Sequence, residues 1–240
     1  MEIKSTFFIM LLACMVFTIC FIMIRSKGAS VYALMTKAMA SFCFIALFIV
    51  SITYEKVFLS QYIGLGLGLV LGLIGDILLD LKVVYKEHEN EYLVGGFISF
   101  GLGHICYILS MIGFVTTGWA VSSIWLAVGI SAGVAVLLTL GVYYTRNIMK
   151  NDFGKHTIIT MVYTFILMFT TVFAVVLAIM NANFWSLAIG FVLFTVSDLI
   201  LSMQYFGGKA DNNLLQVLNH SCYYLAQIVI ASTLFIEILL

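Results

Sequence analysis

Residues 64–81 read GLGLGLVLGLIGDILLDL, an apolar stretch of membrane-spanning length that carries two aspartates, Asp76 and Asp80. A third aspartate, Asp198, interrupts a second apolar stretch, which at residues 191–202 reads FVLFTVSDLILS. A carboxyl group in hydrocarbon is costly unless it faces protein, water or a partner, so ionisable residues in such segments mark functional sites. What these carboxyls face therefore decides both the architecture and the chemistry.

The composition is that of an integral membrane protein. Of the 240 residues, 63% are hydrophobic and 9% are charged, whereas soluble domains are about 45–50% apolar and about 25% charged. The formal net charge of zero gives no reason to expect nucleic-acid binding. All five cysteines fall in apolar runs without CxxC spacing, so neither a disulfide framework nor a zinc site is indicated.

Eight segments are candidates for transmembrane helices, because a span needs roughly 20 mainly apolar residues. Their ranges are 6–24, 31–52, 59–81, 93–115, 119–142, 157–180, 184–206 and 216–239. The first run exceeds the core of a signal peptide, which is about 7–15 residues, so we expect it to be retained. No linker divides the spans, and we predict a single domain, residues 1–240, folded as an all-α bundle of eight transmembrane helices.

The lysines and arginines of the connections predict the orientation of the bundle. One set flanks the connections after the first, third, fifth and seventh helices: Arg25, Lys27, Lys82, Lys86, Arg146, Lys150, Lys155 and Lys209. Only Lys4 and Lys56 flank the opposite side. This bias places the four connections in the cytoplasm and both termini outside, and we expect a plasma (inner) membrane protein.

Polar side chains within the spans gather at one depth. At about 1.5 Å per residue, Asp76 lies about a turn and a half from the cytoplasmic end of its helix, and Asp198 and Lys37 lie about two turns from theirs. Further polar residues of the same half are Asp80, His104, Asn219, His220 and Gln227. The sequence therefore predicts a polar cavity in the cytoplasmic half of the bundle.

Helical periodicity predicts which faces turn inward. Gly64, Gly68, Gly72, Asp76 and Asp80 are spaced by four and share one stripe, and small residues at that spacing permit close helix contact in membranes. Three more stripes combine polar residues at helical spacing: Gly101, His104 and Tyr107; Asp198, Ser202 and Tyr205; and Gln216, Asn219, His220, Tyr223 and Gln227. We expect these faces to meet in one cavity.

Each of these residues also admits a purely structural explanation. Asp80 lies close enough to the loop to be a solvated helix-end carboxylate, and Lys37 could snorkel to the surface. His104 fits a hydrogen-bonded interior histidine, and the amides of the last span fit interhelical hydrogen bonds. Asp76 and Asp198 could form a structural pair with Lys37.

Short motifs at these positions resemble the YhhN family of multi-pass lysoplasmalogenases. In chain order they are Thr36-Lys37, Gly75-Asp76 followed by Leu78-Leu79, Gly103-His104 with Tyr107, Ser197-Asp198 followed by Leu199, and Tyr223 leading to Ala226-Gln227. The motifs extend from the second span to the last, over most of the chain. One departure is Ala38, which stands where the family commonly has a proline after the lysine.

The resemblance implies hydrolysis of the vinyl ether bond of a lysoplasmalogen, which releases a fatty aldehyde and glycerophospho-ethanolamine or -choline. The implied partners are a lysophospholipid substrate and membrane lipid, with no cofactor and no metal. Such cleavage needs a proton donor for the alkene and a carboxylate for the oxocarbenium ion and water, as in glycoside hydrolysis.

Asp76 and Asp198 are the predicted catalytic pair, with the roles of acid and base left open. The predicted substrate-binding residues are Lys37, Asp80, His104, Tyr107, Asn219, His220, Tyr223 and Gln227. A proton-coupled transporter of a lipid-like or small amphiphilic substrate is the alternative, because buried Asp, Lys and His also build proton relays. The sequence lacks the paired interrupted helices typical of inverted repeats. A lipid-binding scaffold would explain a cavity but not two deep carboxyls.

Overall fold

The computed structural model describes residues 2–28, 30–55, 59–116, 118–210 and 212–239. Over these ranges the chain forms helices and no strands, and eight helices are long and apolar enough to cross a membrane. They are α1 (Glu2–Arg25), α2 (Val31–Glu55), α3 (Leu59–Val84), α4 (Glu89–Thr116), α5 (Val121–Thr145), α6 (Thr157–Met180), α7 (Trp185–Tyr205) and α8 (Asn213–Ala231). The predicted all-α architecture with eight spans is confirmed. Met1, Lys56 and Leu240 lie outside the described residues.

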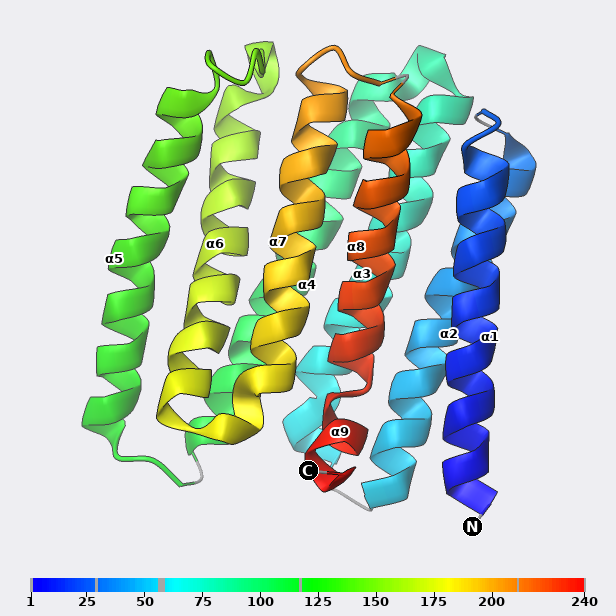
Figure 1. Cartoon of the computed structure of the whole chain (residues 1–240). Helices are drawn as coiled ribbons and strands as arrows, with labels where there is room; N and C mark the ends of the chain where they lie inside the picture. Colours follow the sequence, from blue (N-terminus) through cyan, green and yellow to red (C-terminus); the bar gives the residue numbers. More distant parts are fainter. Residues whose placement is uncertain (1, 29, 56–58, 117, 211, 240) are drawn as a thin grey trace.

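The first seven predicted spans differ from the helices by no more than four residues at either end, and so does the start of the last span, whereas its predicted end at residue 239 is wrong. α8 begins before residue 216 because the Asn212 side chain caps its first turn, accepting a backbone N–H at 3.1 Å. It ends at Ala231, and a short helix, α9 (Thr233–Leu239), turns aside from it (Figure 1). Only two hydroxyl residues, Ser232 and Thr233, interrupt the apolar residues at this break, a signal too weak to locate it from hydropathy alone.

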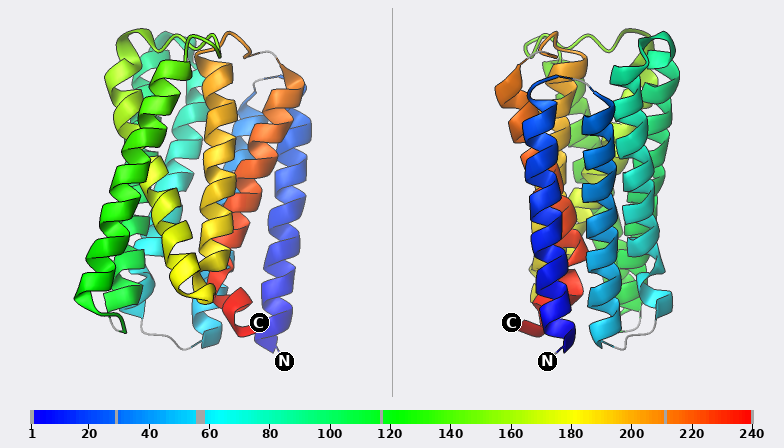
Figure 2. Two further views of the ribbon diagram at one scale, coloured as in Figure 1. Left: turned by 60° about the vertical axis from the view of Figure 1, so that its left-hand side comes forward. Right: turned by 90° about the vertical axis from the view of Figure 1, so that its right-hand side faces the viewer.

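Successive helices run in opposite directions, with both termini at one end of the bundle (Figure 1). Neighbours in sequence pack as pairs, α1 with α2, α3 with α4, α5 with α6 and α7 with α8. α8 also contacts α1, α2 and α3, while α5 stands at the edge of the molecule (Figures 1 and 2). We call the end that carries the connections after α1, α3, α5 and α7 the basic end. That this end faces the cytoplasm stays a prediction.

The outer surface of the bundle is apolar along most of its length. Large exposed side chains on five different helices include Leu12, Met39, Leu109, Trp125 and Ile189. Soluble monomers rarely expose contiguous apolar surface on this scale. Lipid tails are therefore the medium that this surface suits.

The glycine stripe of α3 faces the interior, as its spacing predicts. A Cβ atom at Gly68 would lie 2.2 Å from the ring of Tyr107, and one at Gly64 would lie 2.6 Å from a carbonyl oxygen of α4. Only glycine lets α3 and α4 approach so closely. The same stripe continues to Asp76 and Asp80, and both aspartates are buried.

Candidate functional site

Two of the three intramembrane aspartates line one small cavity among α2, α3, α4, α7 and α8. Its volume is about 30 Å³, enough for one or two water molecules, since one water needs about 10–15 Å³ measured in this way. We call it the carboxyl cavity; its polar lining includes Lys37, Asp76, Asp198, Asn219, His220 and Tyr223. Helices far apart in sequence thus bring six of the ten predicted site residues together.

Asp76 is held by three side chains from two other helices. Its Oδ1 lies 3.4 Å from Nζ of Lys37, and its Oδ2 accepts hydrogen bonds from Ser41 at 2.7 Å and Tyr223 at 2.8 Å. The Tyr223 hydroxyl in turn accepts a hydrogen bond from Gln227 at 2.9 Å. Hydrogen bonds to an ionised carboxylate are stronger than those between neutral groups, so this arrangement stabilises negative charge on Asp76.

Lys37 lies between two carboxylates on successive turns of α3. Its Nζ is 3.4 Å from Asp76 and 3.3 Å from Asp80. Lys37 is 4% exposed and Asp80 is 3% exposed, which rules out a snorkelling lysine and a solvated helix-end carboxylate. If all three groups are ionised, the cluster carries a net charge of −1.

Asp198 has different surroundings from Asp76. The Tyr163 hydroxyl of α6 donates a hydrogen bond to Oδ2 of Asp198, and Ser197 donates to Oδ1 at 3.4 Å. Among the described residues, no lysine or arginine lies within ion-pair distance of Asp198. The structural pair with Lys37 therefore exists for Asp76 and not for Asp198.

The polar residues of α8 divide between two locations. Asn219 donates a hydrogen bond to the Ser197 carbonyl at 2.6 Å, which ties α8 to α7 beside the second aspartate. His220 lies against the edge of Phe21, with ring centroids 4.8 Å apart. Gln216 instead bonds the Ala210 carbonyl in the loop at 2.8 Å and belongs to the basic end. The single polar face expected from periodicity therefore serves both the cavity and the loop.

Four predicted site residues do not line the carboxyl cavity: Asp80, His104, Tyr107 and Gln227. Asp80 and Gln227 reach Asp76 indirectly, through Lys37 and Tyr223. His104 is 1% exposed and packs edge-on against Phe194 at 4.7 Å, and both of its ring nitrogens lack a hydrogen-bond partner. The histidine is thus enclosed by aromatic rings rather than presented to the cavity.

Two hydroxyl donors that reach the aspartates from other helices, Ser41 and Tyr163, were not among the predicted site residues. Ser41 lies four residues after Lys37, on the same face of α2, and this spacing could have identified it. Tyr163 belongs to a polar stripe of α6 with Thr160 and Thr164, hidden in an otherwise apolar span. Nothing in the sequence states that this stripe faces Asp198.

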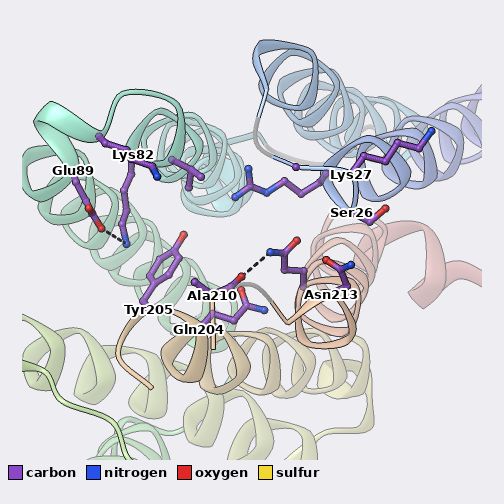
Figure 3. A pocket seen from close by; sticks show the side chains of 13 residues that line it. Ser26, Lys27, Lys82, Glu89, Gln204, Tyr205, Ala210 and Asn213 are labelled. Atoms are coloured by element: carbon purple, nitrogen blue, oxygen red, sulfur yellow. Dashed lines mark hydrogen bonds and ion pairs between the residues drawn. The ribbon is translucent and has the colours of Figure 1, made fainter. Parts of the chain in front are cut away.

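Two further cavities adjoin the carboxyl cavity. One, of about 50 Å³, lies mainly between α6 and α7 and is lined mostly by apolar side chains, with Tyr163 and Asp198 among its polar residues; we call it the apolar cavity. The other, of about 590 Å³, opens at the basic end (Figure 3); we call it the basic cavity. Tyr205 lines all three cavities, so this one side chain lies between the basic cavity and the other two.

No group of three or more His, Cys, Asp or Glu side chains in the described part of the chain is arranged to hold a metal ion. The side chains that line the carboxyl cavity offer two carboxyls, hydroxyls, one ammonium group, one imidazole and one amide.

Comparison with known proteins places the chain at the level of a family. No curated protein and no solved structure matches the chain significantly. The model of the YhhN family matches residues 32–234, which include every residue of the carboxyl cavity. Because that match covers most of its length, the chain belongs to the YhhN family.

Proposed function

We propose that this protein hydrolyses the vinyl ether bond of lysoplasmalogens, releasing a fatty aldehyde and glycerophospho-ethanolamine or -choline. One observation carries the proposal: Asp76 and Asp198, from separate helices and with different partners, line one buried cavity that has room for water. Cleavage of an enol ether begins when an acid protonates carbon, and an ionised carboxylate at the same site can stabilise the oxocarbenium ion and activate water, as in glycoside hydrolysis. The substrate itself comes from the resemblance to lysoplasmalogenases.

The unequal surroundings of the two aspartates divide their roles. Lys37 and two hydroxyl donors stabilise the ionised form of Asp76, so this residue acts as the base. Asp198 has no cationic partner among the described residues and acts as the acid. Two carboxyls whose environments differ in this way are the usual signature of an acid and base pair.

The position of Asp198 matches the polarity of the substrate. Asp198 lines both the carboxyl cavity and the apolar cavity. In a vinyl ether the β-carbon continues into the hydrocarbon chain, whereas the α-carbon carries the oxygen. An acid at the junction therefore meets the carbon that must be protonated, while Asp76 lies on the side where water attacks.

The reaction then balances without another reagent. Asp198 protonates the β-carbon to give an oxocarbenium ion, and water adds to the α-carbon as Asp76 removes its proton. The resulting hemiacetal breaks its bond to the glycerol oxygen and yields the aldehyde and a free hydroxyl. Proton transfer from Asp76 back to Asp198 resets the site.

Access for the hydrocarbon chain is available from the side of the bundle. A groove of about 180 Å³ lies between α4 and α6, and it shares Phe97 and Tyr163 with the apolar cavity. Ile98 and Val162 on its walls are exposed on the apolar outer surface of the bundle. Because the apolar cavity has only about 50 Å³, substrate binding requires α4 and α6 to separate at this groove.

The test compares two lipids on purified protein in detergent or nanodiscs. We expect aldehyde from a lysoplasmalogen and no fatty acid from a saturated 1-acyl lysophospholipid. Asp76→Asn and Asp198→Asn should each abolish aldehyde release, while Glu87→Gln, an exposed control, keeps it. Full activity in either aspartate variant contradicts the mechanism; fatty acid from the acyl lipid indicates an esterase, and neither product favours transport or scaffolding.

A further inference from the structure

The basic cavity is rich in positive charge and in hydrogen-bond donors. Four cationic side chains line it, Arg25, Lys27, Lys82 and Lys86, against one acid, Glu89. Figure 3 shows Lys82, Tyr205 and Gln204 around the same opening. The cavity therefore favours an anion over a neutral or cationic ligand.

Two residues that line this cavity each carry a buried donor without a partner. Nε2 of Gln204 and Nε of Arg25 are both buried without a hydrogen bond, and Gln204 as a residue is 6% exposed. An unsatisfied buried donor costs about 1–3 kcal/mol, and native structures rarely leave one without a reason. An anion with several acceptor oxygens would satisfy these donors once the two side chains turn toward the cavity that they line.

Lys82 is held at the inner wall of the cavity. Its Nζ lies 3.6 Å from the centre of the Tyr205 ring and 3.4 Å from a carboxylate oxygen of Glu89. Glu89 is largely exposed, whereas Lys82 is buried. The ammonium group is thus fixed beside the one side chain that also borders the carboxyl cavity.

The spacing between the two cavities matches a lysophospholipid. Lys82 follows Asp76 by six residues on α3, and Gln204 follows Asp198 by six on α7, so each pair is about 9 Å apart along its helix. About seven bonds separate the phosphorus from the β-carbon of the vinyl ether, and they span about 8 Å when extended, at about 3.5 Å per three bonds. A single lipid can therefore reach from one cavity to the other.

We propose that the basic cavity binds a phosphate anion through Arg25, Lys82, Lys86 and Gln204. This inference rests on the proposed function in one respect: the anion is the headgroup phosphate of the same lysolipid whose ether bond lies in the carboxyl cavity. Gln204 and Arg25 supply the buried donors, and the lysines supply the charge. Tyr205 lies where the glycerol passes from one cavity to the other.

Binding of uncleavable lipids to the full-length protein tests the site without turnover. The probes are a saturated 1-O-alkyl lysophosphatidylethanolamine and the matching 1-O-alkylglycerol, which lacks the phosphate, and calorimetry in detergent gives the Kd of each. We expect Gln204→Glu, which replaces a donor by a charge and breaks no hydrogen bond of Nε2, to weaken the phospholipid about tenfold or more. Lys86→Gln should weaken it several-fold, and the alkylglycerol should bind all proteins alike.

Lys155→Gln is the matched control, because Lys155 is an exposed cation of the basic end that does not line the cavity. Equal affinity of the wild-type protein for the two probes overturns the proposal. So does an unchanged Kd for the phospholipid in both Gln204→Glu and Lys86→Gln. Thermal unfolding of each variant shows whether a loss of binding reflects misfolding, and Lys86, which is exposed, provides a substitution that leaves the core intact.

Inorganic phosphate alone distinguishes the two sources of the anion. If Gln204→Glu weakens binding of inorganic phosphate but not of the alkyl phospholipid, the cavity binds free phosphate and the headgroup assignment is wrong. Weakening of the phospholipid supports that assignment.

Failure of this site and failure of the proposed function give different results. Aldehyde release with an unchanged KM in Gln204→Glu overturns the phosphate site and leaves the hydrolase intact. Probe binding that depends on Gln204, in a wild-type protein that releases no aldehyde, supports the phosphate site and refutes the hydrolase.

Discussion

Removing the charge of Lys37 should destabilise the protein more than any surface substitution, because Lys37 is the cation that pairs with two buried carboxylates. At the observed separations of 3.4 Å and 3.3 Å, and with an effective dielectric constant of about 20, each attraction amounts to about 5 kcal/mol. Much of this is offset by the cost of desolvation, and removing one partner of a buried pair typically costs about 3–5 kcal/mol. We expect Lys37→Met to lose stability in that range.

Asp80→Asn should behave in the opposite way. It leaves Lys37 and Asp76 as a neutral pair, and the new amide oxygen can still accept from the ammonium group, so we expect a loss below about 1 kcal/mol. In the Lys37→Met background the same change removes one of two unpaired, mutually repelling carboxylates. There Asp80→Asn should therefore raise stability, which reverses the sign of its effect.

The measurement is the free energy of unfolding of the four proteins in mixed micelles, followed by circular dichroism during denaturant titration, with Lys155→Met as the surface control. A loss below about 1 kcal/mol for Lys37→Met would refute the reasoning. So would additivity of the two substitutions, because independent effects mean that Lys37 and Asp80 do not interact in the folded protein.

Three further substitutions probe other contacts. Tyr163→Phe removes the hydroxyl group that donates a hydrogen bond to Asp198, and we expect kcat for aldehyde release to fall about tenfold with KM unchanged. Tyr32→Phe, on the surface, should have no effect. Gly68→Ala places a methyl group inside a ring of α4 and should cost about 1–3 kcal/mol of unfolding free energy; Gly129→Ala, in open space on α5, should stabilise its helix slightly. His104→Phe breaks no hydrogen bond, because both ring nitrogens lack partners, and should keep stability and turnover.

These three expectations can each fail clearly. Equal kcat for the Tyr163 and Tyr32 variants would show that the hydroxyl does not influence the acid. Equal stability of the two alanine variants would contradict the close approach of α3 and α4. Loss of turnover in a folded His104→Phe protein would assign the histidine a direct part in the reaction.

Much of the architecture follows from the sequence, because its causes are local. A segment of about 20 apolar residues must be a helix in hydrocarbon, since its backbone groups have no other hydrogen-bond partners there. Spacing by four on α3 then places Gly68, Asp76 and Asp80 on one stripe, and counting residues gives their depth. The end of α8 escaped prediction because the hydroxyl residues at the turn, Ser232 and Thr233, interrupt the apolar run only briefly.

What the stripes contact was decided by the tertiary structure. Periodicity gives the direction of a side chain around its own helix but not the rotation and neighbours of that helix in the bundle. Lys37 could have paired with Asp198, but α2 packs on α3, and Lys37 therefore pairs with Asp76 and Asp80. Asp198 receives its hydrogen bond from Tyr163 on α6 instead.

The three intramembrane aspartates thus differ in the side chains that contact them, and their positions in the chain do not reveal this difference. The apolar length and helical spacing of the sequence determined that Asp76, Asp80 and Asp198 lie within a membrane bundle and turn inward. Packing among helices distant in sequence determined that Asp76 pairs with Lys37, that Asp198 has no cationic partner among the described residues, and that Tyr205 lines three cavities. The physical reason is that hydrocarbon favours helix formation in each span independently of the others. The partner of a buried charge, in contrast, is set by the side chains that neighbouring helices place beside it.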